Sequence, residues 1–218
     1  NQLVGYLYAD MDSIYGLYDE TDRDMLGMLA NQAAVALDNA GLTIGKELVY
    51  QDHLTGVFNR RYFDERLQKL LEVATKDESS VSLLHIDMDN LKYINDTYGH
   101  STGDSALKAL TDCMKNNSRK HDLVCRLGGD EFALVLVNTP GKAALQRAEK
   151  LCEEIRRHTV GNAKKQTTLT ISVGVASFPH TAHTLEQLVK AADSALLAAQ
   201  ARGGNNVALA SIRFDTSS

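Results

Sequence analysis

The sequence has few of the features that mark several common classes of protein. Its three cysteines, Cys113, Cys125 and Cys152, form no CxxC pair, which argues against a disulfide framework or a structural zinc site and fits a reducing cytoplasm. Lysine and arginine do not cluster, and the net charge of −5 is spread along the chain, so duplex nucleic acid is a poor partner. No run approaches the roughly 20 apolar residues of a membrane span, and the layout of a signal peptide is missing. We therefore expect a soluble, cytoplasmic chain without membrane contact, whose cysteines are small core residues.

With 218 residues, the chain is long enough for one large domain plus an appendage. Residues 1–9 are typical of a strand, and the TDRD segment at Thr21–Asp24 is typical of a capping box that opens a long helix. Apolar residues then recur at spacings of four and three, the heptad pattern by which two helices pair: Leu26, Ala30, Ala33, Leu37, Ala40 and Ile44. A helix packed on its own domain fits the same spacing, so both interpretations stay open.

From Asp52 onward, helical and strand patterns alternate, which predicts an α/β (α+β) layout. The expected helices begin with the periodicity of Phe63, Leu67, Leu70 and Leu71 and continue over residues 103–114, 142–158 and 184–203, the last capped by Thr184 with Gln187. The expected strands cover residues 81–87, 124–127, 132–137, 168–178 and 207–209. These elements predict a mixed sheet with helices over one face.

Two acidic clusters lie at the ends of expected strands. In RLGGDEF, Gly128 and Gly129 suit a two-residue hairpin connection, which would place Asp130 and Glu131 at the turn. In HIDMDN, Asp87 and Asp89 would share one face of an extended chain. Taken singly, each pattern also fits a solvated turn or a plain strand end. Together, the four carboxylates would repel one another unless they held a divalent cation, and hard oxygen ligands suit magnesium, which suggests phosphates.

Three segments in this order resemble the signatures of the GGDEF family, the diguanylate cyclases: DHLTGVFNRRYF, IDMDNLKYINDTYGHSTGD and RLGGDEF. The resemblance covers residues 52 to about 215. It implies a fold similar to class III nucleotidyl cyclases and the polymerase palm, with a mixed central sheet flanked by helices. It also implies the conversion of two GTP molecules into cyclic di-GMP and two pyrophosphates by a homodimer in which each subunit holds one GTP.

The N-terminal region resembles a different family. Its segments GYLYAD and DETDRDMLGMLANQAAVALDNAGL are similar to the last strand and closing helix of a GAF sensory domain. We therefore expect residues 1–50 to be a GAF-like remnant with a signalling helix, and residues 51–218 to be the GGDEF domain. The ligand pocket of such a sensory domain would lie mostly outside this chain.

The resemblance also implies roles for the acidic residues. Asp87 and Asp130 would bind Mg²⁺ or Mn²⁺ together with the carbonyl of Met88. Glu131 would complete the acidic site and help to deprotonate the attacking 3′-hydroxyl. The glycines Gly128 and Gly129 have no side chains, so phosphates could approach their backbone amides closely.

Further polar residues would recognise the nucleotide. Asn95 and Asp104 would read guanine, because a carboxylate accepts from the guanine N1 and N2 hydrogens and adenine has no matching donor pair. The alternative is that both residues cap the following helix. Lys92 could contact a phosphate, or it could be a solvated lysine. His100 fits a binding role and a structural role equally.

The segment RKHD has the spacing of the family's RxxD inhibitory site, at which product binds. Arg119 presents a planar fork to phosphate or guanine, and Asp122 can accept from guanine. At the position of a further arginine in the family, this chain has Lys150, which keeps the charge but loses the fork. A surface salt bridge is the alternative interpretation of Arg119 and Asp122.

The chain departs from the family near its end, where AQARGGN stands in place of AKxxGRN. Gln200 replaces the phosphate-binding lysine and Gly204 replaces the arginine, so we expect weaker GTP binding and a high KM. Two functions remain open on these residues. The first is an active diguanylate cyclase controlled by the N-terminal region, and the second is a GGDEF module that binds GTP or cyclic di-GMP without turnover.

The heptad seam makes a testable prediction. If it pairs two subunits, Leu37→Glu places a charge in an apolar interface, and the half-maximal concentration for dimer formation should rise at least about tenfold. Analytical ultracentrifugation over a concentration series measures this shift. An unmoved curve would mean that the helix packs within its own domain.

Overall fold

The computed structural model describes residues 49–162 and 165–211. The strands of the main sheet are β1 (Phe58–Asn59), β2 (Val81–Met88), β3 (Leu123–Gly128), β4 (Glu131–Val137), β7 (Ile171–Phe178) and β8 (Val207–Leu209). The helices are α2 (Arg60–Lys76), α3 (Leu91–Tyr98), α4 (His100–Asn116), α5 (Gly141–Ile155) and α6 (Leu185–Ala201), and a separate hairpin joins β5 (Thr159–Asn162) to β6 (Lys165–Thr168). None of the helices in these ranges combines the length and the apolar character needed to cross a bilayer.

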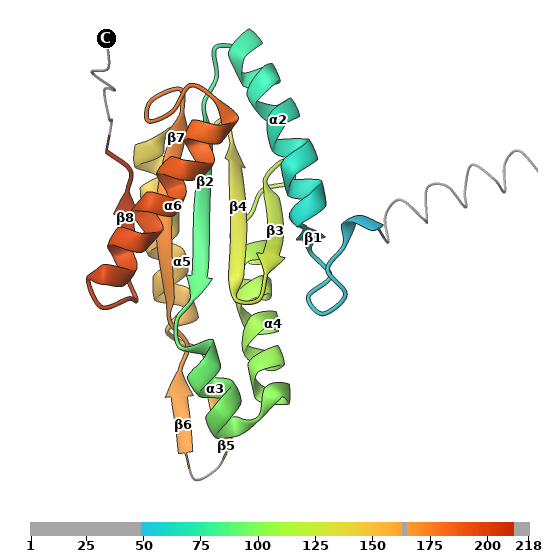
Figure 1. Ribbon diagram of the computed structural model, residues 1–218, viewed down its shortest axis with the longest axis vertical. Coiled ribbons are helices and arrows are strands. Elements are labelled where there is room, and N and C mark those ends of the chain that lie inside the picture. Colours follow the sequence, from blue (N-terminus) through green and yellow to red (C-terminus); the bar gives the residue numbers. More distant parts are fainter. Residues whose placement is uncertain (1–48, 163–164, 212–218) are drawn as a thin grey trace, which may run out of the picture. The chain divides into compact units, whose positions relative to one another are not determined.

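The main sheet has six strands in the order β1-β3-β4-β2-β7-β8 (Figure 1). The central strand β2 is antiparallel to both β4 and β7, whereas β1 is parallel to β3 and β8 is parallel to β7. The sheet is therefore mixed, as the sequence predicts. In Figure 1, β2 ends at the same edge of the sheet as the β3–β4 turn, next to α3.

Helices cover both faces of the sheet, so the expectation of helices over one face was wrong. In Figure 1, α2 and α6 lie on one side and α4 and α5 lie on the other. The reason is visible in β2, where Val81 and Leu83 pack toward α2 and α6 while Leu84 and Ile86 pack toward α4 and α5. A strand that is apolar on both faces needs cover on both.

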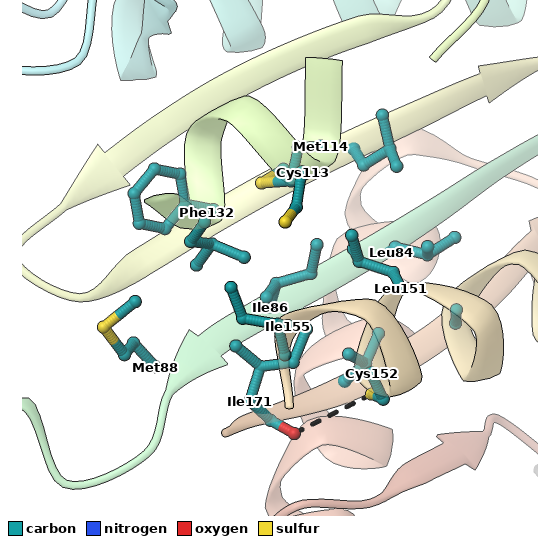
Figure 2. Packing of buried hydrophobic residues seen from close by; sticks show 14 of the residues in the cluster. Leu84, Ile86, Met88, Cys113, Met114, Phe132, Leu151, Cys152, Ile155 and Ile171 are labelled. Atoms are coloured by element: carbon teal, nitrogen blue, oxygen red, sulfur yellow. Dashed lines mark hydrogen bonds between the residues drawn. The ribbon is translucent and has the colours of Figure 1, made fainter. Parts of the chain in front are cut away.

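The core on the α4–α5 side fixes the end of β2 that carries the acidic residues. Figure 2 shows Ile86 and Met88 of β2 among side chains from α4, α5 and β4, including the fully buried Met114, Ile155 and Phe132. Each such side chain contributes about 1.5–3 kcal/mol when it is fully buried. Because Met88 is anchored in this core, its neighbour Asp87 projects to the opposite face of the strand.

Several expected boundaries differ from those in the structure. The connection in RLGGDEF is Gly129–Asp130, because β3 continues to Gly128, which pairs with Glu131 after a bulge at Leu127. The expected strand 168–178 is interrupted, since Thr168 ends β6 and Ile171 begins β7. Helix α3 and the β5–β6 hairpin were missed, because α3 has no side-chain cap and the hairpin sequence does not alternate.

Other local predictions are confirmed. Thr184 caps α6 by accepting a hydrogen bond from the Gln187 amide at 3.2 Å. All three cysteines are free and buried. The TDRD box, the heptad seam and the GAF-like segments fall within residues 1–48, outside the described residues, so these stay predictions.

Candidate active site

The acidic residues of the two motifs meet where β2 ends beside the β3–β4 turn. Asp87 and Glu131 are register partners on adjacent strands. The backbone amide of Met88 donates to the carbonyl oxygen of Asp130 at 3.1 Å, which attaches the turn to the end of β2. Since successive residues of a strand alternate between its faces, Asp87 and Glu131 lie on the face that α2 and α6 cover. Asp87 is thus brought next to Asp130 and Glu131, which lie 43 and 44 positions further along the sequence.

Two arginines hold this turn from outside the carboxylates. Arg126 donates through Nη2 and Nε to the carbonyl oxygen of Gly129, at 2.7 and 3.1 Å, and through Nη1 to Asp52 at 3.1 Å. Arg60 donates through Nε to the carbonyl of Leu127 at 3.0 Å and reaches Glu131 at 3.5 Å. Sequence reasoning assigned no role to either arginine, although both belong to the quoted motifs. Their guanidinium groups thus hold the carbonyls of Leu127 and Gly129, on either side of Gly128.

The glycines of the turn have the conformational freedom that its shape requires. Gly128 and Gly129 have φ angles of +148° and +52°, which residues with a Cβ rarely adopt. Both are exposed, and an added Cβ on either would meet no atom within 4 Å. The requirement for glycine here is therefore conformational, and the open space beside the turn leaves its backbone accessible to a ligand.

The electrostatics of the cluster favour a cation. Burial and the charge of Asp130 raise the pKa of Asp87 from 3.8 to about 6, and Asp89 and Glu131 act in the same direction. Carboxylate oxygens are ligands that Mg²⁺ and Mn²⁺ prefer. Among the described residues, no three acidic, histidine or cysteine side chains form a ready ligand set. The neighbouring carboxylates of Asp87 and Asp130 fit an ion such as magnesium that takes one or two carboxylates and fills its other positions with waters or substrate phosphates.

Asp89, which follows the end of β2, is held by two hydrogen bonds. It accepts a hydrogen bond from the Ser172 hydroxyl at 2.6 Å and another from the Asn205 amide at 2.8 Å. These bonds fix the loop after α6, in which Gly204 has a φ of +72°. A Cβ on Gly204 would lie 3.0 Å from Oδ1 of Asp89, so an arginine at this position would be strained. The departure from the family at position 204 therefore matches a local backbone that favours glycine.

The other departure, Gln200, contacts the acidic cluster directly. Its Nε2 donates to Oδ1 of Asp87 at 3.1 Å. Both residues line a cavity of about 320 Å³ between α2 and α6, whose wall also includes Glu131 and the apolar side chains of Phe63 and Leu196. The cavity opens a route to the carboxylates on this face of the sheet.

The residues expected to read guanine lie on α3 and α4. No side chain caps α4, whose N-cap is Gly99, so the interpretation of Asn95 and Asp104 as helix caps was wrong. Oδ1 of Asn95 lies over Gly103, at 1.9 Å from the position that a Cβ would take. Gly103 thus makes room for Asn95 beside the exposed Asp104. Lys92 and His100 are both exposed, near the starts of α3 and α4.

The RxxD segment forms a buried ion pair that the sequence did not predict. Oδ2 of Asp122 accepts from Arg147 Nη2 at 2.7 Å and from the Arg119 amide at 2.9 Å, while Oδ1 accepts from the Val137 amide at 3.2 Å. The Asp122 side chain is only 1% exposed. Arg119 is exposed, and Lys150 pairs with Glu154 at 3.4 Å on the surface of α5. Arg147 lies three residues before Lys150 on α5, about one helical turn away. This spacing was the signal in the sequence that Arg147 could reach the RxxD segment.

Comparison with known proteins agrees with this geometry. The family "Diguanylate cyclase, GGDEF domain" matches residues 49–206. The chain belongs to the GGDEF family. Among curated GGDEF proteins, it is 40% identical to the response regulator PleD of Caulobacter vibrioides over 167 residues, which are 74% of this chain and 36% of that protein. It is 31% identical to diguanylate cyclase A of Treponema denticola over 214 residues, or 96% of this chain and 57% of that protein.

Solved structures share the fold. The GGDEF domain of TpbB (YfiN) from Pseudomonas aeruginosa superposes with a TM-score of 0.70 at 32% identity, covering 74% of this chain and 95% of that one. The coiled coil and GGDEF domain of DgcB from Caulobacter crescentus, solved in complex with c-di-GMP, gives a TM-score of 0.78 at 24% identity, covering 85% and 99%. The mixed α/β fold expected for a GGDEF domain is confirmed. The chain spans between about a third and about three fifths of the length of the curated relatives described above.

The raised pKa of Asp87 predicts that its ionised carboxylate lowers the folding stability of this GGDEF domain. Because the folded state holds the Asp87 proton more tightly than the unfolded state, stability is lost as the pH rises from about 4 to about 6. In EDTA at pH 7.5, Asp87→Asn should raise the free energy of unfolding by about 1–2 kcal/mol, since one pKa unit corresponds to about 1.4 kcal/mol and partial exposure screens the site. Urea denaturation at pH 7.5 and 4.5 checks this. The gain should shrink at pH 4.5, and a variant no more stable than the parent at pH 7.5 would contradict the prediction.

The Asp122–Arg147 pair predicts that the RxxD residues differ in their effect on stability. Removal of one partner from a buried ion pair costs about 3–5 kcal/mol, and we expect the lower end for Asp122→Asn because 20% of the Arg147 side chain is exposed. Arg119→Ala is the matched control, since its backbone amide is retained and surface changes stay within about 0.5 kcal/mol. Thermal and urea unfolding measure both variants. Equal stability of the two would show that the pair is not structural.

Proposed function

We propose that this chain is an active diguanylate cyclase, which condenses two GTP molecules into cyclic di-GMP and two pyrophosphates. The observation that carries the proposal is the pairing of Asp87 with Glu131 beside Asp130, which concentrates negative charge where the turn leaves its backbone open. The GGDEF relatives named diguanylate cyclases support the same reaction. The cavity between α2 and α6 gives access to these carboxylates.

In the proposed reaction, the 3′-oxygen of one GTP attacks the α-phosphorus of the other and displaces pyrophosphate, and the reciprocal step closes the ring. A Mg²⁺ or Mn²⁺ ion held by Asp87, Asp130 and the Met88 carbonyl would neutralise charge on the phosphates. Glu131 would hold the proton that leaves the 3′-hydroxyl. Gly128 and Gly129 would donate their backbone amides to phosphate oxygens. Asn95 and Asp104 would orient the guanine, and Lys92 and His100 would contact the nucleotide from the starts of the same helices.

The proposal requires two subunits, because each would bring one GTP to the reaction. A homodimer assembled through the N-terminal helix fits the heptad seam, and a sensory region at residues 1–50 would then control how the two GGDEF domains meet. Product inhibition through Arg119, Asp122 and Lys150 receives less support. A guanine would have to compete with Arg147 and two backbone amides for the oxygens of Asp122.

A second function is a binding module that holds GTP or cyclic di-GMP without turnover. Gln200 and Gly204 favour it, because neither supplies a positive charge to the triphosphate. The presence of Asp87, Asp130 and Glu131 weighs against it, since a module that only binds would not need this costly group of carboxylates. The two functions differ in their product, which makes them separable.

Incubation with GTP and Mg²⁺, followed by chromatography of the nucleotides, tests the proposal. The parent should form cyclic di-GMP, and ATP in place of GTP should form no cyclic dinucleotide. Because bound metal supplies several kcal/mol of transition-state stabilisation, Asp130→Asn should lower turnover at least about a hundredfold. Asp112→Asn, an exposed carboxylate on α4, is the matched control and should behave as the parent. GTP binding without any product would favour the binding module.

A further inference from the structure

Helix α6 reaches the acidic cluster because its backbone packs directly on β7 at Gly174. A Cβ on Gly174 of β7 would lie 2.1 Å from the carbonyl oxygen of Ala192 and 2.3 Å from the amide of Leu196, so the helix backbone rests directly on the strand. One turn further along α6, Gln200 stands over the end of β2. Its contact with Asp87 is therefore set by rigid packing of a helix on a sheet.

Gln200 is the single side chain, within the described residues, that donates a hydrogen bond to the Asp87 carboxylate. The other groups near Asp87 are the carboxylates of Asp130, Asp89 and Glu131, all of the same sign. The guanidinium of Arg60 contacts Glu131 at 3.5 Å. Without Gln200, the carboxylate of Asp87 would have no described donor to fix its orientation.

The chemistry of an amide differs from that of a cation at this position. The Nε2 group of Gln200 can only donate, so it occupies Oδ1 of Asp87 and leaves Oδ2 available to a metal ion. Because the amide carries no charge, it does not neutralise Asp87, and the full negative charge remains to attract a divalent cation. An ammonium group at the same place would compete with that cation for the carboxylate.

We propose that Gln200 is a positioning residue that orients Asp87 as a ligand for a divalent cation. The inference rests on the metal site of the proposed function and extends it to a residue at which this chain departs from its family. In this inference Gln200 acts on the metal site through Asp87. From the sequence alone, Gln200 is only the loss of a phosphate-binding lysine. Residues that orient a metal ligand through a hydrogen bond typically change metal affinity about 10- to 100-fold when they are replaced.

Binding of Mn²⁺ without nucleotide tests this inference apart from catalysis. Free Mn²⁺ is measured by electron paramagnetic resonance during titration of the full chain. Gln200→Met keeps the unbranched shape and removes the donor, and it should raise the Mn²⁺ dissociation constant about tenfold. Gln200→Lys should raise it at least as much, and added salt should reduce the difference from the parent because salt screens the ammonium charge. Gln146→Leu, an exposed glutamine on α5, is the matched control and should bind as the parent does.

The outcomes are separable from those of the proposed function. Equal Mn²⁺ affinity in the parent and Gln200→Met, or no Mn²⁺ binding by the parent, would overturn the inference. If Gln200→Met fails to fold, Gln200→Leu, which also removes the donor without adding a charge, decides by the same measurement. Mn²⁺ binding that depends on Gln200, in a parent that makes no cyclic di-GMP, would keep the positioning role and reject the enzyme.

Discussion

The mutual repulsion of carboxylates at the ends of neighbouring strands is the constraint on which this site depends. Asp87, Asp130 and Glu131 are brought together by the pairing of β2 with β4 and by the bond from the Met88 amide to the Asp130 carbonyl. The cost is visible in the pKa of Asp87, which burial and the charge of Asp130 raise to about 6. A protein tolerates such a cost where the charge is used, and a divalent cation is the partner whose chemistry fits.

The surrounding structure supports this constraint without cancelling it. The buried cluster that contains Met88 fixes the strand end, and Arg126, whose guanidinium lies over the ring of Phe132 in the same cluster, fixes the turn through the Gly129 carbonyl. Arg60 and Arg126 bind backbone carbonyls and the carboxylates of Glu131 and Asp52, and within the described part of the chain Asp87 receives only the neutral amide of Gln200. The negative charge on Asp87 therefore stays available. The end of β2 is held in place by backbone hydrogen bonds and packing, which do not compete with a ligand for the Asp87 carboxylate.

The same distinction separates the two halves of the RxxD segment. Asp122 is held by the guanidinium of Arg147 and two backbone amides, so its position is set by the fold. The side chain of Arg119 is exposed and takes no part in these bonds. Position 204 is similar, because a left-handed backbone beside Asp89 favours glycine whatever the ligand requires. The departure from the family pattern at position 204 thus has a local structural cause.

The sequence by itself determined the family, the mixed sheet and most element positions, because apolar periodicity and the motifs at Asp87 and Asp130 are local signals. It also indicated the Thr184 cap, which depends on residues three positions apart. Only the tertiary structure decided that helices cover both faces, that the turn is Gly129–Asp130, that Asp122 pairs with Arg147 and that Gln200 meets Asp87. These features depend on contacts between residues 25 and 113 positions apart, or on a bulge in the strand register. Spacing along the chain carries no information about such contacts, because packing of helices on the sheet creates them.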